Sequence, residues 1–549
     1  MGIPYYFTYL IKNHTQIIDN LKNKTTINNL FLDSNSLVYD SIDYTKFENK
    51  SQFENYIIKS VVEKLELIIK TINPTNRVFI AFDGVPPIAK LNQQKNRRYK
   101  TWYQNSILNK DSVWDTCAIT PGTIFMDKLK CVITQHFTST NINKPKIILS
   151  LSDVPGEGEH KIYEYIRNNN LIHENALIYG MDADLIMLSL NHLKYCSAIY
   201  LYRETPHFIS NIDINLNSDE KYLININLLG NQIYKELTDD ITRQTDTPQW
   251  LVDASNNMDY IFTETQNRDD KFYAKIDDYI FICFLLGNDF LPHFAAINIR
   301  INGFTVLIEL YKSLFGVKKY LIKNGTIVLA NFKLFIGKLA ENEENYLKEL
   351  YNIRNKQSKK RYSENTEEER LNKFVAIPMQ DRNIELFINP YEAHWEYRYY
   401  YSLFDVDVDC DSSVISNICK NYLETLLWTY YYYSKECVNW NHYYKYHYPP
   451  LLIDLYKHIP YFDSELVLPK NNNVIHPYLL LAYVLPKKSL DLLPDKIHNY
   501  LLKNYENHYG EDYEFVYAFC KYFWEGHVKF LDLDFDKFAV DINKLILLT

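Results

Sequence analysis

Acidic residues stand inside the most hydrophobic stretches of this 549-residue chain. They fall in five short segments, FLDSNS, FIAFDG, VPGEGEH, IYGMDADL and LLGNDFLPH, and each segment indicates the end of a strand or the start of a helix. Carboxylates are seldom buried without a partner, so a cation must gather them. Two Mg²⁺ ions held by oxygen ligands are the usual solution. The predicted metal ligands, which are also the predicted catalytic residues, are Asp33, Asp83, Glu157, Glu159, Asp182, Asp184 and Asp289.

The first 200 residues alternate between short apolar runs and helical patterns. Continuous apolar runs are typical of a parallel sheet covered on both faces, so the pattern predicts an α/β core whose sheet is flanked by helices. Ligands of such sheets bind beyond the carboxyl ends of the strands, where Asp33, Asp83 and Asp182 would lie. The predicted strands are 29–33, 77–83, 146–151, 176–181 and 198–202.

Composition limits the classes of function. The net charge of −9 argues against a protein that coats nucleic acid nonspecifically, but it allows an enzyme with one basic channel. Eight cysteines without a CxxC pair or zinc spacing indicate a reducing compartment. No signal peptide follows Met1, and the longest apolar run, YIFICFLLG, is too short to span a membrane. The 48 tyrosines fit a bias toward AT-rich codons better than a surplus of base-stacking surfaces.

A charge-rich segment divides the chain. Residues 341–384 lose their apolar periodicity after the first turns, which indicates a solvated helix or a charged linker. The segment separates a first region, residues 1–340, from a second region, residues 385–549. The second region carries aromatic clusters such as WTYYYYSKECVNWNHYYKYHYPP, and we expect it to be mostly helical.

A basic stripe follows Pro86-Pro87, a suitable opening for a helix. Its four polar residues recur at i, i+4, i+7 and i+8 and would share one face of that helix. A charged stripe alone is more often a solvated face, but this one lacks the acidic partners of an i, i+4 ladder. Arginine, lysine and glutamine together suit a terminal phosphate. The predicted 5′-phosphate-binding residues are Lys90, Gln94, Arg97 and Arg98.

The carboxylates and the stripe together describe an exonuclease. No matching set of lysines or arginines stands near the acidic segments, which favours metal ions over ion pairs as their partners. Two hard cations held by oxygen ligands catalyse in-line displacement at phosphorus. A phosphate pocket beside such a site would hold the 5′ end of a nucleic acid.

The same segments resemble the signature blocks of the eukaryotic 5′→3′ exoribonucleases. The resemblance runs through both halves of the chain, with gaps at 205–270 and 320–385. The blocks are MGIPYYF, FDGVPPIAKLNQQKNRRYK, CAITPGTIFM, SDVPGEGEHKIYEYIR, IYGMDADLIML, CFLLGNDFLPH, NWNHYYKYHYPP, LLLAYVLPKKSLDLLP and WEGHV.

This resemblance implies a PIN-like nuclease core, related to flap endonucleases, over residues 1–340, and a second region that closes the active-site pocket. It implies processive, Mg²⁺-dependent release of 5′-mononucleotides from single-stranded RNA with a 5′ monophosphate, and we expect Mn²⁺ to substitute. The seven carboxylates match the family's metal site, and the basic stripe matches its 5′-phosphate pocket. The implied setting is RNA decay after decapping, by a monomer acting beside the decapping machinery.

Two departures from the family pattern concern substrate bases and chain length. Tyr39 stands where relatives have a histidine that stacks on a base, and tyrosine can stack but does not titrate near neutral pH. Trp440 is the candidate for the opposite stacking ring, and His442 stands where a second tryptophan is often found. The chain carries neither the C-terminal extension of the large cytoplasmic relatives nor a zinc-knuckle-like insertion, so we expect a compact member of the cytoplasmic branch.

Three alternatives remain at this point. A structure-specific 5′ flap endonuclease on DNA shares the acidic core, but GNDFLPHFAAINIRINGF lacks the Gly-x-Gly pattern of that group. A non-catalytic protein that binds RNA 5′ ends, or an inert protein whose carboxylates cap helices, would be favoured by missing carboxylates, and none is missing. The short form and the codon bias suit a large DNA virus or a protist, and a viral protein would act in the host cytoplasm.

Overall fold

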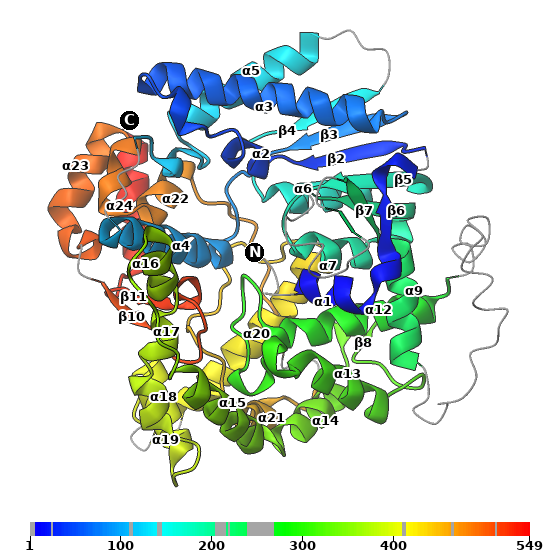
Figure 1. Cartoon of the computed structure of the whole chain (residues 1–549), viewed down its shortest axis with the longest axis vertical. Helices are drawn as coiled ribbons and strands as arrows, with labels where there is room; N and C mark the ends of the chain where they lie inside the picture. Colours follow the sequence, from blue (N-terminus) through cyan, green and yellow to red (C-terminus); the bar gives the residue numbers. More distant parts are fainter. Residues whose placement is uncertain are drawn as a thin grey trace.

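A twisted sheet organises the first half of the chain (Figure 1). The computed structural model describes residues 6–23, 26–108, 113–139, 145–203, 216–217, 220–238, 268–408, 413–462, 466–510 and 513–548. Residues 1–5, the start of the block MGIPYYF, and Cys410 lie outside this range. Within it, seven strands form one sheet in the order β1-β7-β6-β5-β2-β3-β4. The strands are β1 (Ile18–Asn20), β2 (Asn29–Asp33), β3 (Arg77–Ala81), β4 (Lys146–Ser150), β5 (Leu171–Tyr179), β6 (Cys196–Tyr202) and β7 (Tyr222–Asn225).

The five predicted strands are all present, and β2 to β6 pair in parallel. The sheet is extended at one edge by β7, which pairs antiparallel with both β6 and β1. The sequence does not predict β1, because its three residues are all partly exposed and give no apolar run. The mainly parallel α/β core is therefore confirmed, with a short antiparallel edge added.

The direction of winding reverses beside β2. From β2 the chain moves outward through β3 to β4, and it then returns to place β5 and β6 on the other side of β2. The point between β2 and β5 is therefore the topological switch point of the sheet, where α/β proteins form their ligand sites. Asp33 is the last residue of β2, and Asp182 follows three residues after the end of β5.

Helices cover both faces of this sheet (Figure 1). Alternate residues of a strand point to opposite faces, so Leu30 and Leu32 pack with α3 (Lys50–Ile72) and α5 (Ile124–Ser139), while Phe31 packs with α6 (Gly158–Asn168) and α7 (Asp184–Asn191). α3 begins where the Asn49 side chain accepts a hydrogen bond from Gln52 N, and it ends at Asn73 in the left-handed conformation.

The remaining helices lie mostly in the second half of the chain. The predicted helical character of this half is confirmed, and two short hairpins accompany the helices. The other elements are α1 (Tyr6–Asn13), α2 (Asn35–Tyr39), α4 (Ile88–Ile107), α9 (Ile226–Thr238), α12 (Asp270–Cys283), α13 (Gly303–Leu314), α14 (Leu329–Ala340), α15 (Glu343–Gln357), α16 (Glu367–Val375), α17 (Ile377–Gln380), α18 (Asn383–Ile388), α19 (Trp395–Phe404), α20 (Ser413–Ser434), α21 (Leu452–His458), α22 (Pro477–Val484), α23 (Asp495–Asn504), α24 (Phe535–Ile546) and the hairpins β8 (Ile322–Lys323), β9 (Thr326–Ile327) and β10 (Glu514–Val516), β11 (His527–Lys529).

The two halves share one hydrophobic core. α20 is buried on almost all sides, and Trp428, Tyr430 and Tyr433 pack in the same cluster as Phe281 and Phe284, which lie in and just after α12. Tyrosines also make up most of the largest fully buried side chains of the described residues. Much of the tyrosine surplus therefore fills the interior rather than forming a binding surface.

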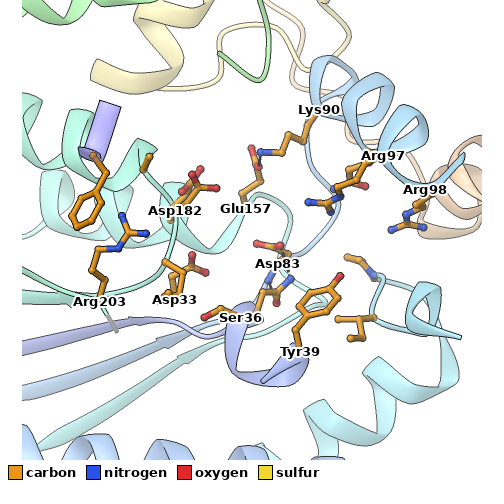
Figure 2. Close-up of a pocket in the computed structure, with 18 of the residues that line it drawn as sticks. Asp33, Ser36, Tyr39, Asp83, Lys90, Arg97, Arg98, Glu157, Asp182 and Arg203 are labelled. Atoms are coloured by element: carbon orange, nitrogen blue, oxygen red, sulfur yellow. Dashed lines mark hydrogen bonds and ion pairs between the residues drawn. The ribbon is translucent and has the colours of Figure 1, made fainter. Parts of the chain in front are cut away.

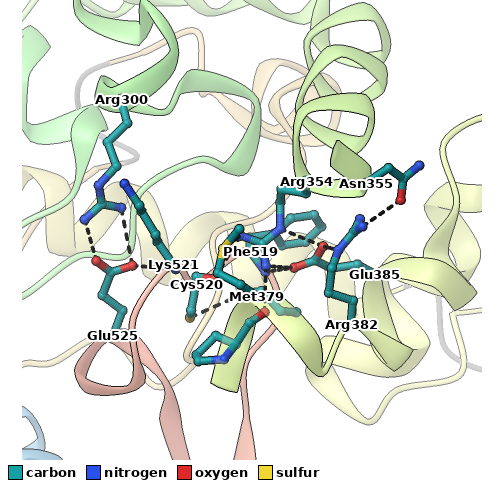
Figure 3. A network of polar contacts seen from close by, with 12 residues as sticks. Arg300, Arg354, Asn355, Met379, Arg382, Glu385, Phe519, Cys520, Lys521 and Glu525 are labelled. Carbon is teal, nitrogen blue, oxygen red and sulfur yellow. Dashed lines mark hydrogen bonds and ion pairs between the residues drawn. The ribbon is translucent and has the colours of Figure 1, made fainter. Parts of the chain in front are cut away.

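The charge-rich segment between the predicted regions is packed at its two ends and mostly exposed between them, over residues 359–373. Its first helix, α15, buries Arg354, whose guanidinium is paired with Glu385 of α18 (Figure 3). Arg382 Nε donates to Glu385 Oε2 at 2.7 Å, and Phe519 N donates to the other carboxylate oxygen at 2.7 Å. Arg354 also donates to the carbonyl of Cys520 at 2.8 Å. This network joins α15 and α18 to the segment before β11, while the domain boundary itself stays a prediction. Among the described residues, no helix has the length and apolar character that crossing a membrane requires.

Candidate active site

A cavity of about 540 Å³ opens at the switch point of the sheet (Figure 2). It brings together ten of the thirteen side chains that the sequence assigns to metal, phosphate or base binding. Asp184 and Asp289 do not line it but act electrostatically on Asp182, and Trp440 does not line it either. The ten residues are Asp33, Asp83, Glu157, Glu159, Asp182, Lys90, Gln94, Arg97, Arg98 and Tyr39.

Short backbone approaches hold the carboxylates of this cavity in place. Gly158 begins α6, and its N–H donates to Asp83 Oδ1 at 2.7 Å. A Cβ atom at Gly158 would stand 2.6 Å from Asp33 Oδ1, so a larger residue here would push against the carboxylate. Asn35 fixes the other side of Asp83, because its Nδ2 donates to Asp83 Oδ2 while Asp83 N donates to Asn35 Oδ1 at 3.1 Å. Gly158, the second glycine of VPGEGEH, therefore allows a close contact between protein groups.

The carboxylates repel one another. Burial raises the pKa of Asp33 well above its ordinary value, and the charges of Asp83 and Asp182 raise it further. Burial also raises the pKa of Asp184 to about 8, again with help from Asp182 and from Asp289. Such raised pKa values indicate a site with an excess of negative charge, which hard cations would relieve.

Lys90 lies among the carboxylates and contacts two of them. Its Nζ is 2.6 Å from Glu157 Oε1 and 2.6 Å from Asp289 Oδ2. Burial opposes the charge, but Asp289 and Glu157 raise the pKa of Lys90 well above its usual value. The pKa of Asp289 lies below its ordinary value even though burial raises it, and the charge and hydrogen bond of Lys90 contribute to this lowering. The sequence places Lys90 in the neighbouring phosphate pocket, whereas in the structure its ammonium group contacts the carboxylate cluster itself.

The residues fit a pair of divalent cations. A single ammonium group compensates at most one unit of charge, and seven carboxylates surround or adjoin the cavity. Ligand atoms of Glu157, Glu159 and His160 also lie within 4.8 Å of one another. Carboxylate oxygens in this number are the ligand set that Mg²⁺ takes in proteins. The helix-cap alternative does not account for Glu157, whose side chain makes no cap hydrogen bond at α6.

The basic stripe lies on α4, which begins directly after Pro87 as predicted. Arg97 is exposed to the cavity, whereas Arg98 is half-buried and donates through Nη2 to Thr120 Oγ1 at 2.8 Å. Nη1 of Arg98 is buried and has no hydrogen-bond partner among the described residues, and the same holds for Oε1 of Gln94. Burial lowers the pKa of Arg98. A buried guanidinium with an unused donor is suited to an anionic ligand.

The two predicted stacking residues occupy different positions. Tyr39 ends α2, is 44% exposed and lines the cavity opposite the arginines (Figure 2). The partly exposed Trp440 is tied by its backbone, because Ile88 N donates to Trp440 O at 2.9 Å and Trp440 N donates to Asn471 O at 2.8 Å. Trp440 therefore lies beside the start of α4, and its stacking role stays a prediction.

Several residues of the site carry no signal in the sequence. Tyr432 of α20 donates its hydroxyl to Glu157 Oε2 at 2.9 Å, and the His160 ring stacks on it with centroids 3.6 Å apart. Arg203 and Phe7 line the cavity on the far side of the carboxylates. The proximity of Asn35 to Asp33 in sequence could have marked it, but nothing local distinguishes Tyr432 from its tyrosine neighbours.

The sequence of this chain matches two models of known protein families. Residues 1–205 match a family model described as XRN 5′-3′ exonuclease N-terminus, and residues 269–385 and 380–539 match one described as Xrn1 helical domain. The second model thus also matches residues 320–385, a stretch in which no individual signature block resembles the family. The stretch between residues 205 and 269 is left outside both matches.

Curated relatives are similar over most of the chain at low identity. The 5′-3′ exoribonuclease 2 of Gallus gallus is 24% identical, over 96% of this chain and 68% of the relative. The 5′-3′ exoribonuclease 2 homolog of Drosophila melanogaster is 25% identical, over 96% of this chain and 69% of the relative. The 5′-3′ exoribonuclease 1 of Saccharomyces cerevisiae is 25% identical, over 90% of this chain and 40% of the relative. The chain thus spans between two fifths and about two thirds of these relatives.

Proposed function

Since the chain belongs to the XRN 5′-3′ exonuclease family, we propose that it is a processive, Mg²⁺-dependent 5′→3′ exoribonuclease. Its substrate would be single-stranded RNA with a 5′ monophosphate, and its product 5′-mononucleotides. The observation that carries the proposal is that one cavity holds both a carboxylate cluster and the arginines of α4. A phosphate bound at one end would place the next phosphodiester at the other.

The arginines would recognise the 5′ end. Arg97 offers an exposed guanidinium, and Arg98 offers an Nη1 that no described residue uses. Forked donors match the oxygens of a terminal phosphate better than a single ammonium does. Lys90, which already contacts Glu157 and Asp289, would contribute positive charge between the two ends of the cavity. Gln94 would donate through Nε2 to the same phosphate.

The carboxylates would hold two Mg²⁺ ions near the scissile phosphodiester. When bound, these ions supply Lewis acidity toward the phosphoryl oxygens and favour ionisation of water. The protein's part is to fix the ligands: Gly158 and Asn35 orient Asp83, while Tyr432 and Lys90 orient Glu157. Burial keeps bulk water away from Glu157 and Glu159.

The bases would be held by aromatic rings, with Tyr39 against the first nucleotide. Stacking of this kind tolerates any base, as a processive enzyme requires. A cap is too bulky for the space between Tyr39 and α4, and a 5′ triphosphate adds both bulk and charge. Such an end preference suits RNA decay after decapping in the cytoplasm, and Mn²⁺ would substitute for Mg²⁺.

The test is a digestion series on one RNA sequence prepared with a cap, a triphosphate, a monophosphate or a hydroxyl group at its 5′ end. The monophosphate form should be degraded to mononucleotides in Mg²⁺ and spared in EDTA. In the double variant Arg97→Ala, Arg98→Ala the monophosphate should lose its advantage over the hydroxyl end, because each lost charge-assisted contact costs about tenfold or more. Arg361→Ala with Arg370→Ala, two arginines exposed in the described structure, is the matched control.

Each other outcome of this series rejects part of the proposal. A preference for the monophosphate that survives in the Arg97, Arg98 variant would show that the phosphate pocket is elsewhere. Cleavage of a DNA flap in preference to the RNA would identify a flap endonuclease. Binding of the monophosphate RNA without any release of mononucleotides would identify a non-catalytic end-binding protein.

A further inference from the structure

A second cationic position lies in the cavity, across the carboxylates from α4 (Figure 2). Arg203 follows directly after β6, the strand that pairs with β5. The carboxyl ends of neighbouring parallel strands meet at one edge, so Arg203 stands beside the segment that carries Asp182. Figure 2 shows Arg203 at one end of the group of carboxylates and Arg97 and Arg98 at the other.

The guanidinium of Arg203 is held by a ring and not by a carboxylate. Its Cζ lies 4.0 Å from the centroid of the Phe7 ring in α1. Its Nε is buried and has no hydrogen-bond partner among the described residues. By contrast, the buried Arg354 donates to Glu385, to Pro378 and to Cys520. The stacked ring fixes the plane of the Arg203 guanidinium and leaves its donors available.

Two roles fit this position. The charge of Asp182 acts on Arg203, so the arginine could serve only to position that carboxylate. However, no ion pair joins Arg203 to a carboxylate in the part of the chain that the structure describes. A buried donor without a partner is costly, so the buried Nε of Arg203 is more simply explained if the guanidinium binds a phosphate of the nucleic acid.

We propose that Arg203, stacked on Phe7, binds the phosphodiester next to the scissile one on its 3′ side. This subsite rests on the proposed exoribonuclease function. With the 5′ phosphate at Arg97 and Arg98 and the scissile phosphate at the carboxylates, the strand continues toward the opposite end of the cavity, where Arg203 lies. A guanidinium matches the two free oxygens of a phosphodiester.

Short substrates separate this role from the positioning role. The dinucleotide pNpN contains the 5′ phosphate and the scissile phosphodiester but no phosphate beyond them. The trinucleotide pNpNpN adds one phosphodiester on the 3′ side. Initial rates of first cleavage give kcat/KM for both substrates in Mg²⁺. We expect Arg203→Gln to lower the ratio of the trinucleotide value to the dinucleotide value about tenfold. Arg203→Lys should lower it less, since a point charge keeps part of the attraction.

The ratio protects the test from folding defects, since a partly unfolded preparation lowers both rates equally. Arg98→Gln should lower both rates and leave the ratio unchanged, and the exposed Arg370→Gln should change neither. If Arg203→Gln lowers both rates equally, or lowers neither, the subsite is wrong while the exoribonuclease function stands. If the unsubstituted chain cleaves neither oligonucleotide, the proposed function fails and the subsite fails with it.

Discussion

Replacing Lys90 with methionine should destabilise the metal-free protein far more than the Mg²⁺-bound protein. The Lys90 ammonium is 2.6 Å from an oxygen of Glu157 and 2.6 Å from an oxygen of Asp289, and all three side chains are at least nine-tenths buried. Removing one partner of a buried ion pair leaves an uncompensated charge and costs about 3–5 kcal/mol. Methionine has nearly the same length, so little of that loss comes from a cavity.

Mg²⁺ should change this cost, because the proposed metal site uses the same carboxylates. In the unsubstituted protein the Lys90 ammonium and the metal ions would compete for Glu157 and Asp289. Without this competition, Lys90→Met should bind the metal more tightly than the unsubstituted protein does. At saturating Mg²⁺, each tenfold gain in metal affinity adds about 1.4 kcal/mol to the unfolding free energy. We therefore expect Mg²⁺ to raise the unfolding free energy of the variant by about 2 kcal/mol more than that of the unsubstituted protein.

Urea denaturation with EDTA and with Mg²⁺ measures this difference for each protein. Lys470→Met is the matched control, because Lys470 forms an exposed ion pair with Glu436 and its side chain is 75% exposed. The control should shift the unfolding free energy by less than about 1 kcal/mol, and equally in both buffers. An equal loss for Lys90→Met in EDTA and in Mg²⁺ would show that the carboxylates around Lys90 do not bind the metal, and would refute the reasoning.

Two further predictions concern single carboxylates. Asp182→Asn should slow cleavage of monophosphate RNA by about a thousandfold or more while leaving binding of the RNA largely intact, measured by single-turnover kinetics and a filter-binding assay; full activity would exclude the metal site. Burial raises the pKa of Glu343 to about 8, so its contribution to stability is fully present below pH 4.5 and is lost as the pH rises through about 8. Urea denaturation should therefore show the unfolding free energy of Glu343→Gln rising relative to that of the unsubstituted protein, by up to about 1.4 kcal/mol per pH unit between pH 5 and 8. A difference in unfolding free energy that does not change with pH would show that Glu343 is charged in the folded protein.

The sheet and the carboxylates were predictable because their signals are local. The parallel strand β2 has five residues, and its three apolar residues lead directly to Asp33, so the apolar run and the carboxylate are both visible in the sequence. The strand order was not predicted in detail, but the rule that ligands lie at the carboxyl ends of the strands was enough to gather Asp33, Asp83 and Asp182. The edge strands β1 and β7 gave no comparable signal, since both are short and β1 is partly exposed throughout.

The position of Lys90 could not be predicted, because it depends on where α4 lies. The stripe pattern places Lys90 on the same helix face as Arg97 and Arg98, and the structure keeps all three on one cavity. Whether the ammonium reaches the carboxylates depends on packing against residues far along the chain. Ile88 and Leu91 of α4 pack with α22, α23 and α24, and these helices begin between about 390 and 450 residues later.

Tyr432 was hidden for a related reason. It belongs to a run of four consecutive tyrosines in a helix that is buried on almost every side. Helical periodicity marks a functional face only when another face is exposed to solvent. Tyr430 reaches toward Asp277, whereas Tyr432 donates to Glu157, and the sequence cannot tell these two environments apart.

The second half of the chain shapes the site chiefly by holding α4. Asp289 forms the ion pair with Lys90, Tyr432 donates to Glu157, and the remaining contributions are contacts to the helix. The carbonyl of Trp440 accepts a hydrogen bond from Ile88 N, and Lys100 donates to the carbonyl of Gly526 at 3.0 Å. Lys95 has no carboxylate partner among the described residues; its Nζ lies 2.8 Å from His508 Nε2 and 4.3 Å from the centroid of the Phe530 ring, and burial lowers its pKa to about 7. Because α4 carries both the arginines proposed to bind the 5′ phosphate and the lysine that contacts the carboxylates, a small shift of this one helix would change both ends of the cavity together.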